Sequence, residues 1–333
     1  MNCKNENSNE ILVGRICEIQ KDIYHIWYEG QELSGVLRGK FFREEMEFPV
    51  VGDYVHFRYN PYGNSTIMEI EPRKSVLKRP DQSGHAIGYV KCMKEQVMVA
   101  NFDYVFILSS LNDNYNKNRI ARYISITLQG GGIPVVVLTK ADLCDRVQDY
   151  VQELLSLSDK ARIHAISSMT GEGLDALSAY LLPGKTIAFL GSSGVGKSTL
   201  VNALAGKEIM KTGAIRDKDA KGRHTTTHRE MILLPSGVVM IDTPGMRELG
   251  MCDVSEGIDD TFSDITELAK KCRFGDCTHK SEPDCAIKKA LKEGTLSEER
   301  WLLYKSLQKE SRKSGKMKQI AKMRKEGQIR RKK

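Results

Sequence analysis

The chain has 333 residues, which suggests two or three domains, and 40% of its residues are hydrophobic. No apolar run approaches the roughly 20 residues that a membrane-spanning helix needs, and the first ten residues lack the apolar core of a signal peptide. We therefore expect a cytoplasmic protein with no membrane partner, in which the eight cysteines are thiols or metal ligands, not disulfides.

The first part of the chain consists of short segments rich in β-branched and aromatic residues. Residues 11–19, 23–28, 52–59 and 66–70 show no helical period and are separated by turn signals. This pattern predicts a small β-barrel, for which an OB-type barrel is the best interpretation and an SH3-like barrel the alternative. Its aromatic residues pack in the core or stack on nucleic acid, and core packing is the favoured role. Residues 1–72 carry seven basic and twelve acidic residues, which weakens the interpretation of the barrel as a basic groove for nucleic acid.

A connector follows the barrel. It begins with a basic cluster, Arg73, Lys74, Lys78 and Arg79, which is either a contact to RNA or a solvated loop.

From residue 97 the sequence pattern changes from short strands to strands that alternate with helices. Buried strands are predicted at 97–100, 104–108, 133–138 and 163–166, and helices at 118–128 and 149–157. Strands that alternate with helices predict a doubly wound parallel sheet with ligand loops at the strand ends.

The stretch 186–205 carries the most specific motif. An apolar strand, 186–190, leads into G-x-x-x-x-G-K-S and then into a helix that Lys197 opens. In this context, glycine backbone N–H groups and the helix N-terminus hold phosphate, and a turn that binds nothing is the weaker alternative. Lys197 would reach the β- and γ-phosphates and Ser198 would ligate Mg²⁺. The predicted phosphate-binding residues are Gly191, Ser192, Ser193, Gly194, Val195, Gly196, Lys197, Ser198 and Thr199.

Two loops upstream have the chemistry for reading a guanine base. Thr139-Lys140-Ala-Asp142 resembles the Asn-Lys-x-Asp box of GTP-binding proteins. The Asp142 carboxylate would accept two hydrogen bonds that guanine offers and adenine does not, and the Lys140 stem would cover the base. Thr139 replaces Asn, so an amide that usually ties this loop down is missing. The second loop, Ser167-Ser168 and the residues to Gly171, resembles the loop that offers backbone N–H groups to guanine O6.

A further buried strand, 238–242, ends in Asp242-Thr-Pro-Gly245. Asp242 would bind Mg²⁺ through water, and the Gly245 N–H would sense the γ-phosphate. Between Lys197 and Asp242 lies a loop in which Thr226 is slightly favoured over its threonine neighbours to close over Mg²⁺. Met246 stands where many GTPases have a glutamine that orients water. His224 is our candidate substitute, and a surface histidine without such a role is the alternative.

The last segment holds a metal motif and a basic tail. Cys272, Cys277, His279 and Cys285 offer three thiolates and one imidazole within fourteen residues, which predicts a closed, structural Zn²⁺ site. Four unrelated reduced side chains are the alternative. Residues 286–294 and 297–309 read as helices. Residues 309–333 hold twelve Lys or Arg and two Glu, which leaves a net charge of −2 for the rest of the chain. This tail predicts a polyanionic partner, RNA above all, with a solvated tail as the alternative.

The order of the motifs is diagnostic. The base-reading loops precede the phosphate loop, whereas ordinary GTPases run the other way, so the motif order is circularly permuted. With the barrel and the Cys-x4-Cys-x-His-x5-Cys motif, the whole chain resembles the RsgA (YjeQ) family of circularly permuted GTPases. The resemblance implies an OB-fold barrel at 1–75, a GTPase domain at 76–250 with its connector at 76–96, and a zinc-binding, basic helical domain at 251–333.

The resemblance also implies a function. We expect a monomeric GTPase that uses GTP/GDP, Mg²⁺ and one structural Zn²⁺, contacts rRNA, and assists late maturation of the small ribosomal subunit, which stimulates hydrolysis. The catalytic residues would be His224, Lys197 and Thr226. Two other classes are weighed against this expectation: an RNA-binding protein with a vestigial nucleotide site, and a P-loop ATPase or kinase. Lys197, Ser198 and Asp242 oppose the first, and Asp142 opposes the second.

Overall fold

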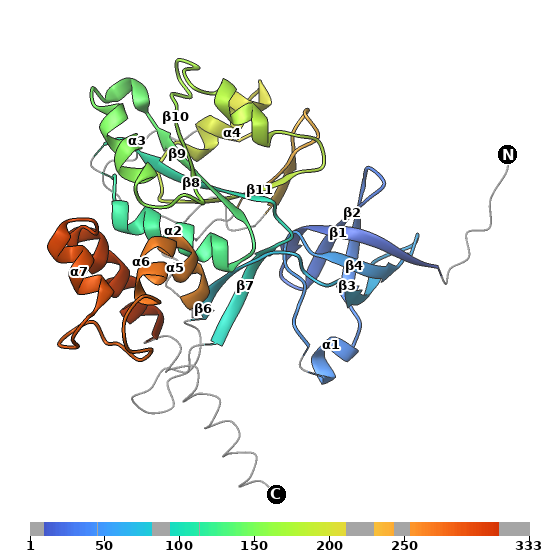
Figure 1. Ribbon diagram of the computed structural model, residues 1–333. Coiled ribbons are helices and arrows are strands. Elements are labelled where there is room, and N and C mark those ends of the chain that lie inside the picture. Colours follow the sequence, from blue (N-terminus) through green and yellow to red (C-terminus); the bar gives the residue numbers. More distant parts are fainter. Residues whose placement is uncertain are drawn as a thin grey trace, which may run out of the picture. The chain divides into compact units, whose positions relative to one another are not determined.

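The computed structural model describes residues 10–44, 46–81, 94–112, 114–210, 230–242 and 254–312 (Figure 1). The chain divides into two compact units. Unit 1 comprises Met1–Leu77, Val97–Phe106 and Leu174–Glu248, and unit 2 comprises Lys78–Gln96, Ile107–Gly173 and Leu249–Lys333. The predicted domain boundaries near residues 75 and 250 stay predictions. Among the residues that the structure describes, no helix has both the length and the apolar composition that crossing a bilayer requires.

Unit 1 contains a five-stranded barrel. Its strands are β1 (Ile11–Gln20), β2 (Ile23–Tyr28), β3 (Gln31–Leu37), β4 (Tyr54–Arg58) and β5 (Ser65–Ile70), with the short helix α1 (Lys40–Arg43) between β3 and β4. The order is β1-β2-β3-β5-β4, and β4 closes back on β1. β3 and β5 run parallel. Alternate residues point inward, so Ile16, Ile26, Val55, Phe57 and Ile67 are fully buried. The predicted OB-type barrel is confirmed.

One arginine joins the barrel to later strands of unit 1, and another joins the segment after β5 back to the barrel. Arg15, on β1, is buried and donates to the hydroxyl of Thr186 over 2.9 Å and to the carbonyl of Asn101 over 2.8 Å. Burial lowers the pKa of Arg15. Arg73 donates through Nε and Nη2 to the two carboxylate oxygens of Asp53, each over 2.8 Å, and Asp53 is fully buried. Arg73 is therefore neither a solvated residue nor open to RNA, because a buried carboxylate requires its charge.

The phosphate-loop half of the central sheet also belongs to unit 1. β11 (Thr186–Gly191) runs parallel to β13 (Val239–Asp242), and β12 (Glu230–Leu233) runs antiparallel to β13 and also pairs with β1 at Glu18. The first three residues of β8 (Tyr104–Ser110) lie in this unit as well. A 3₁₀ helix (Asp175–Tyr180) and α4 (Lys197–Ala205) complete it. The parallel strands bring the carboxyl ends of β11 and β13 to the same edge.

The strand predicted at 97–100 pairs differently from expectation. β7 (Lys94–Ala100) forms a separate two-stranded sheet with β6 (Val76–Asp81), so its assignment to the parallel sheet is wrong. Met98, Val99 and Ala100 are fully buried, as their apolar run requires. Ala100 N–H donates to the carbonyl of Val51 over 3.2 Å. An apolar run therefore predicted burial correctly, but the partner was decided by contacts distant in sequence.

Unit 2 contains the other half of the alternating pattern. β9 (Ile133–Thr139) and β10 (Arg162–Ala165) are parallel, and β9 neighbours β8. α2 (Lys117–Gln129) begins at Asn116, whose side chain accepts from the N–H of Arg119 over 2.9 Å, and ends at Gly130. A 3₁₀ helix (Ala141–Leu143) and α3 (Val147–Leu155) follow β9. These elements match the predicted strand–helix alternation.

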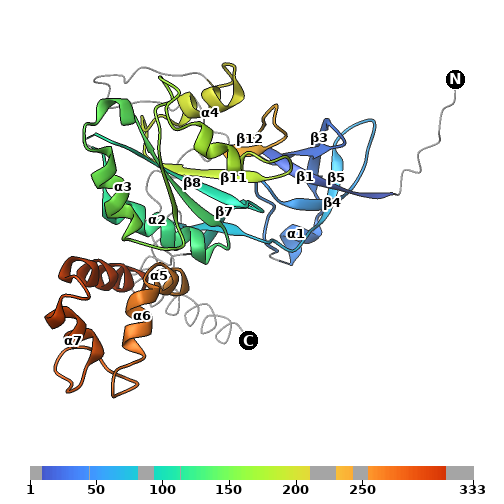
Figure 2. The ribbon, with the colours of Figure 1, turned by 45° about the horizontal axis from the view of Figure 1, so that its top comes forward.

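The C-terminal helices pack on α2 within the same unit. They are α5 (Ser255–Thr261), α6 (Ser263–Ala269), α7 (Ala286–Glu293) and the helical residues 298–312. α5 lies beside α2 in both views (Figures 1 and 2). A Cβ added to Gly257 would lie 2.0 Å from the carbonyl oxygen of Ser125, so only glycine permits this approach. The hydroxyls of Ser125 and Thr261 lie 2.9 Å apart and hydrogen-bond at this contact.

Candidate active site and metal centre

The phosphate loop of unit 1 has the geometry of an anion site. β11 is buried along its length, and the chain then turns through Gly191–Gly196 before α4 begins at Lys197. Gly196 has φ +98°, a conformation that side chains disfavour, and it is the N-cap of α4. Val195 is 2% exposed and anchors the loop in the core. The first N–H groups of α4 have no acceptor within the helix, so they and the helix dipole favour a bound phosphate.

Asp242 lies where the sequence placed it, beside this loop. It is the last residue of β13, and its carboxylate forms an ion pair with the ammonium of Lys197. The Lys197 side chain is 27% exposed and that of Asp242 is 10% exposed. Ser198 is the second residue of α4 and is half-buried. The structure thus brings together, within unit 1, a cation for phosphate and two oxygen ligands of the kind that Mg²⁺ prefers.

The two base-reading loops of unit 2 are joined by their backbones. Lys140 has a left-handed conformation with φ +61°, and Asp142 is exposed in the 3₁₀ helix that follows β9. The N–H of Ala141 donates to the carbonyl of Ile166 over 3.0 Å, one residue before Ser167. The structure therefore places the Thr139–Asp142 loop and the Ser167–Ser168 loop next to each other.

The second loop is a tight turn. Ser167 is fully buried, and its hydroxyl accepts from the N–H groups of Met169 over 3.3 Å and Thr170 over 3.2 Å. The N–H of Gly171 donates to the Ser167 carbonyl over 2.9 Å. Met169 is 81% exposed, at the position where the related loop of other GTPases often has Lys. The serine hydroxyl therefore shapes the backbone of this loop.

Three predicted residues lie outside the described residues: His224, Thr226 and Gly245. Their roles stay predictions. The phosphate loop belongs to unit 1 and the base-reading loops belong to unit 2. Their use of one common nucleotide also stays a prediction.

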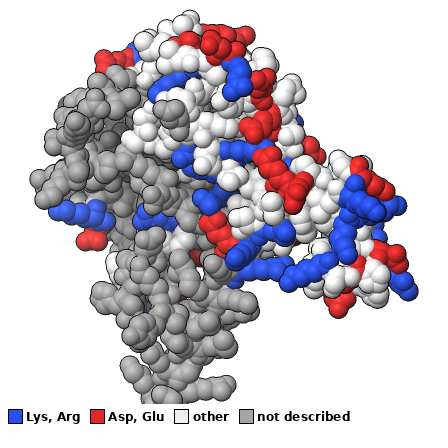
Figure 3. Space-filling model, turned by 90° about the vertical axis from the view of Figure 1, so that its left-hand side faces the viewer, with Lys and Arg blue, Asp and Glu red and all other residues white. Residues whose placement is uncertain are grey.

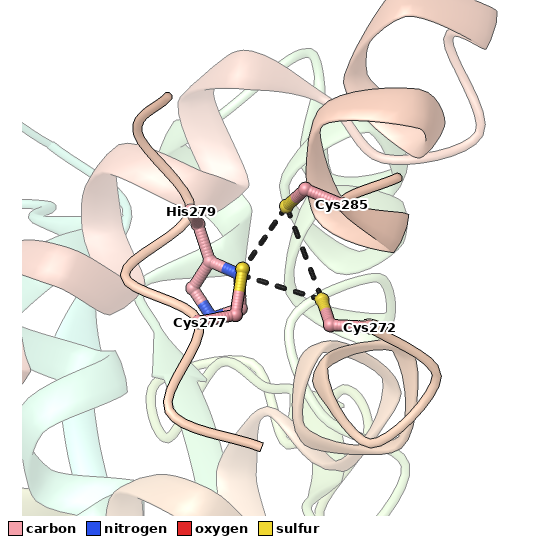
Figure 4. Close-up of side chains that lie close together, drawn as sticks. All are labelled: Cys272, Cys277, His279 and Cys285. Carbon is pink, nitrogen blue, oxygen red and sulfur yellow. Dashed lines mark hydrogen bonds between the residues drawn. The ribbon is translucent and has the colours of Figure 1, made fainter. Parts of the chain in front are cut away.

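The metal centre is complete within unit 2 (Figure 4). The ligand atoms of Cys272, Cys277, His279 and Cys285 all lie within 4.8 Å of one another. The sulfurs of Cys272 and Cys285 are 3.9 Å apart, and His279 Nδ1 lies 3.6 Å and 3.4 Å from them. A tetrahedral zinc ion with Zn–S bonds of about 2.3 Å would place two sulfurs about 3.8 Å apart, and a sulfur and a nitrogen about 3.5 Å apart. The donor set and its spacing fit zinc.

The surroundings of the cluster act in opposite directions on two of its thiols, because burial and the neighbouring cysteines raise the pKa of Cys277 to about 11. Burial opposes ionisation of Cys272, but backbone hydrogen bonds from Ala286 and Ile287, at the start of α7, lower the pKa of its thiol. The ligand loop is held by Glu282, whose carboxylate accepts from the hydroxyl of Thr278 over 2.5 Å and from its N–H over 2.8 Å. These bonds lower the pKa of Glu282 to about 2. The loop is therefore shaped by its own side chains before any partner binds.

Sequence reasoning missed the side chains that dock this centre on the rest of unit 2. Trp301 is buried and meets the ring of His279 edge to face, with 5.6 Å between ring centroids. Arg300 donates to both carboxylate oxygens of Asp264 over 2.8 and 2.6 Å and to the carbonyl of Leu157 over 2.8 Å. The two residues lie fifteen and sixteen positions beyond the last ligand. Glu282, in contrast, lies between the ligands His279 and Cys285. Its position in the motif could have indicated that it holds the ligand loop.

Comparison with known proteins supports the same architecture. Residues 70–252, more than half of the chain, match the family model described as RsgA GTPase. The chain belongs to the RsgA GTPase family. A relative from Listeria monocytogenes, named small ribosomal subunit biogenesis GTPase RsgA 1, is 40% identical over 299 residues, 89% of this chain and 83% of the relative. A Lactiplantibacillus plantarum relative, named small ribosomal subunit biogenesis GTPase RsgA 2, is 42% identical over 307 residues, 91% of this chain and 84% of the relative.

Solved structures agree with the fold of this RsgA-family chain. YjeQ from Thermotoga maritima superposes with a TM-score of 0.68 at 26% identity, and the match covers 91% of this chain and 99% of that one. YloQ, described as a circularly permuted GTPase, matches with a TM-score of 0.64 at 24% identity, and the match covers 93% of this chain and 98% of that one. The predicted architecture of a barrel, a permuted P-loop GTPase fold and a Cys/His cluster is confirmed.

Proposed function

We propose that this chain hydrolyses GTP to GDP and phosphate, binds the small ribosomal subunit and assists its late maturation. The observation that carries the proposal is the phosphate loop, with Lys197 against Asp242, in a chain of the RsgA GTPase family. The name that the relatives share, small ribosomal subunit biogenesis GTPase, supports the subunit as the partner.

The phosphate-loop residues have distinct roles in this proposal. The N–H groups of the loop and of the first turn of α4 hold the phosphate oxygens. Lys197 would exchange its bond with Asp242 for one with the β- and γ-phosphates, and Ser198 and Asp242 would hold Mg²⁺. When bound there, Mg²⁺ would neutralise charge that develops on the phosphate oxygens. The Lys197–Asp242 pair keeps both side chains oriented toward the loop before this exchange.

Guanine selection rests on the loops of unit 2. Asp142 is exposed, and its carboxylate accepts from guanine N1–H and from the exocyclic amine. The loop of Ser167 and Ser168 offers backbone N–H groups to guanine O6. The bond between Ala141 and Ile166 supports the joint action of these loops on one base, because it holds them at a fixed spacing.

Hydrolysis is assigned to residues that lie outside the described part of the chain. Thr226 closes over the metal ion, Gly245 senses the γ-phosphate, and His224 orients the attacking water once the subunit is bound. Normal subunit-stimulated turnover in His224→Ala would contradict the last assignment.

An RNA surface is supported by charge on unit 2. The side of the molecule drawn in Figure 3 carries a band of Lys and Arg side chains. The region of the metal centre, residues 270–292, holds seven basic and three acidic residues, and all seven basic residues are exposed. These are Lys270, Lys271, Arg273, Lys280, Lys288, Lys289 and Lys292. Such a surface binds phosphate backbones, so we assign it to rRNA, with one structural Zn²⁺ holding its loop.

The decisive experiment is GTP turnover with and without purified small subunits, for wild type and Lys197→Ala. We expect slow turnover alone, stimulation by subunits, and loss of both in the variant. Competition of GTP binding by ATP would instead support an ATPase or kinase. Absence of turnover with subunits present would support a vestigial nucleotide site.

A further inference from the structure

The loop that follows β8 touches the base-reading motif at the position where the motif departs from its usual sequence. The N–H of Leu111 donates to the carbonyl of Thr139 over 3.0 Å. Asn112 closes this loop on itself: its side-chain oxygen accepts from the Ser110 hydroxyl over 2.8 Å and from the N–H of Asn114 over 3.1 Å. Leu111 therefore holds the backbone of Thr139, and the Asn112 side chain fixes Ser110 and Asn114 on either side of it. The usual asparagine would provide its own amide for that purpose.

The far end of the same loop is held by acidic side chains. The hydroxyl of Tyr115 donates to Glu153, on α3, over 2.5 Å, and the ring of Tyr115 meets that of Tyr150 with centroids 4.6 Å apart. Burial and the bond to Glu153 raise the pKa of Tyr115, so the phenol stays a donor. Lys117, at the start of α2, lies 3.3 Å from Glu153 and 3.0 Å from Glu299. One lysine thus bridges α3 and the C-terminal helical residues.

Glu299 belongs to a short run of residues that reaches back to the metal centre. Its neighbour Arg300 binds Asp264 and the carbonyls of Ser156 and Leu157, directly after α3. The next residue, Trp301, packs against His279. Three consecutive side chains therefore connect the Cys/His cluster, the end of α3 and the loop that holds Thr139, all within unit 2.

We propose that Asn112 is a positioning residue for guanine recognition, and that Glu299 of the C-terminal helix supports it through Lys117. The C-terminal region then contributes to guanine-nucleotide affinity without touching the base. The N–H of Tyr115 donates to the carbonyl of Asn112 over 2.9 Å, which joins the contacts of Glu299 and Lys117 to the loop that holds Thr139. A contiguous chain of contacts is the physical requirement for such coupling. The proposal rests on the proposed function, because it assigns a role toward the guanine site.

The test measures dissociation constants of full-length, zinc-loaded protein for GDP and for IDP, which lacks the exocyclic amine that Asp142 reads. Asn112→Ala should weaken GDP binding about tenfold, the effect of losing well-formed hydrogen bonds. Glu299→Gln should weaken it about two- to threefold, as for an exposed ion pair. Both variants should lower the ratio of IDP to GDP dissociation constants, which general destabilisation would leave unchanged.

Asn118→Ala and Glu298→Gln are matched controls, because both residues are exposed and neither has a side-chain hydrogen bond or ion pair in the described structure.

A second variant separates positioning from folding. Thr139→Asn restores the amide of the usual motif, so in that background Asn112→Ala should have a smaller effect on GDP binding than in wild type. Suppose that wild type binds GDP normally and that Asn112→Ala and Glu299→Gln keep its GDP-to-IDP preference. This result would overturn the positioning role and leave the proposed function standing. A wild type that does not distinguish GDP from ADP would overturn the proposed function instead.

Discussion

The metal centre and the nucleotide loops differ in how far along the chain their residues are spread. The four metal ligands lie within fourteen residues and within one unit. The nucleotide loops extend from Thr139 to Asp242 and are divided between the two units. A local site is shaped by its own loop, as the bonds of Glu282 show. The proposed nucleotide site is distributed over both units, and each loop is shaped by the strands of its own unit, so its residues are separable by mutation.

Loss of the metal should have the largest effect, and a local one. Cys277→Ser should release the zinc ion and unfold the ligand loop, since metal binding supplies about 10 kcal/mol or more of folding free energy in small zinc motifs. Zinc content and limited proteolysis within residues 270–297 measure this. Cys144→Ser, a half-buried thiol elsewhere in unit 2, is the control. Equal protease resistance of metal-free and metal-loaded protein would contradict a structural role.

Lys197→Ala should break the distributed site without changing the fold. Removing one cation that stabilises transition-state charge costs about 100- to 1,000-fold in turnover. Subunit-stimulated GTP hydrolysis measures it, and zinc content should stay at the wild-type level. Lys207→Ala, an exposed lysine just after α4, is the control. Turnover within threefold of wild type would remove the phosphate loop from the mechanism.

The same contrast explains what the sequence could predict. Their spacing in the sequence was enough to single out the four Cys and His residues that lie together and the loop between β11 and α4, and their roles as ligands stay predictions. The strand at 97–100 was assigned to the wrong sheet, because burial of Met98 and Val99 does not reveal a pairing partner. Arg73 was placed in an exposed or RNA-binding cluster, because nothing near it in sequence indicates the buried Asp53. These two predictions were wrong because contacts between residues far apart in sequence determine the strand pairing and the burial.

Asp142→Asn should change which base the distributed site accepts. An amide donates a hydrogen bond where the carboxylate accepts two, so GDP binding should weaken by about 100-fold and xanthosine diphosphate, with a carbonyl in place of the amine, should bind better than GDP. Fluorescent nucleotide titration measures both constants. Asp145→Asn, an exposed neighbour, should leave them unchanged. Wild-type preference for GDP in Asp142→Asn would show that this loop does not read the base.

The smallest expected effect concerns the contact that joins the metal centre to α3. Burial would raise the pKa of Asp264, but hydrogen bonds and charge from Arg300 outweigh it and lower the pKa below its usual value. A carboxyl group with a depressed pKa stabilises the folded state above its unfolded pKa, and this contribution is lost as pH falls through the folded pKa. The difference in unfolding free energy between wild type and Asp264→Asn should therefore be constant near neutral pH. It should shrink below about pH 4, the usual Asp pKa.

Denaturant titrations at several pH values measure this difference. Zinc loss at low pH affects both proteins equally and therefore cancels. Asp159→Asn, an exposed acid near the same end of α3, should show no such pH dependence. If the wild-type and Asp264→Asn curves stay parallel down to pH 3, Arg300 holds the helix through the carbonyls of Ser156 and Leu157 instead.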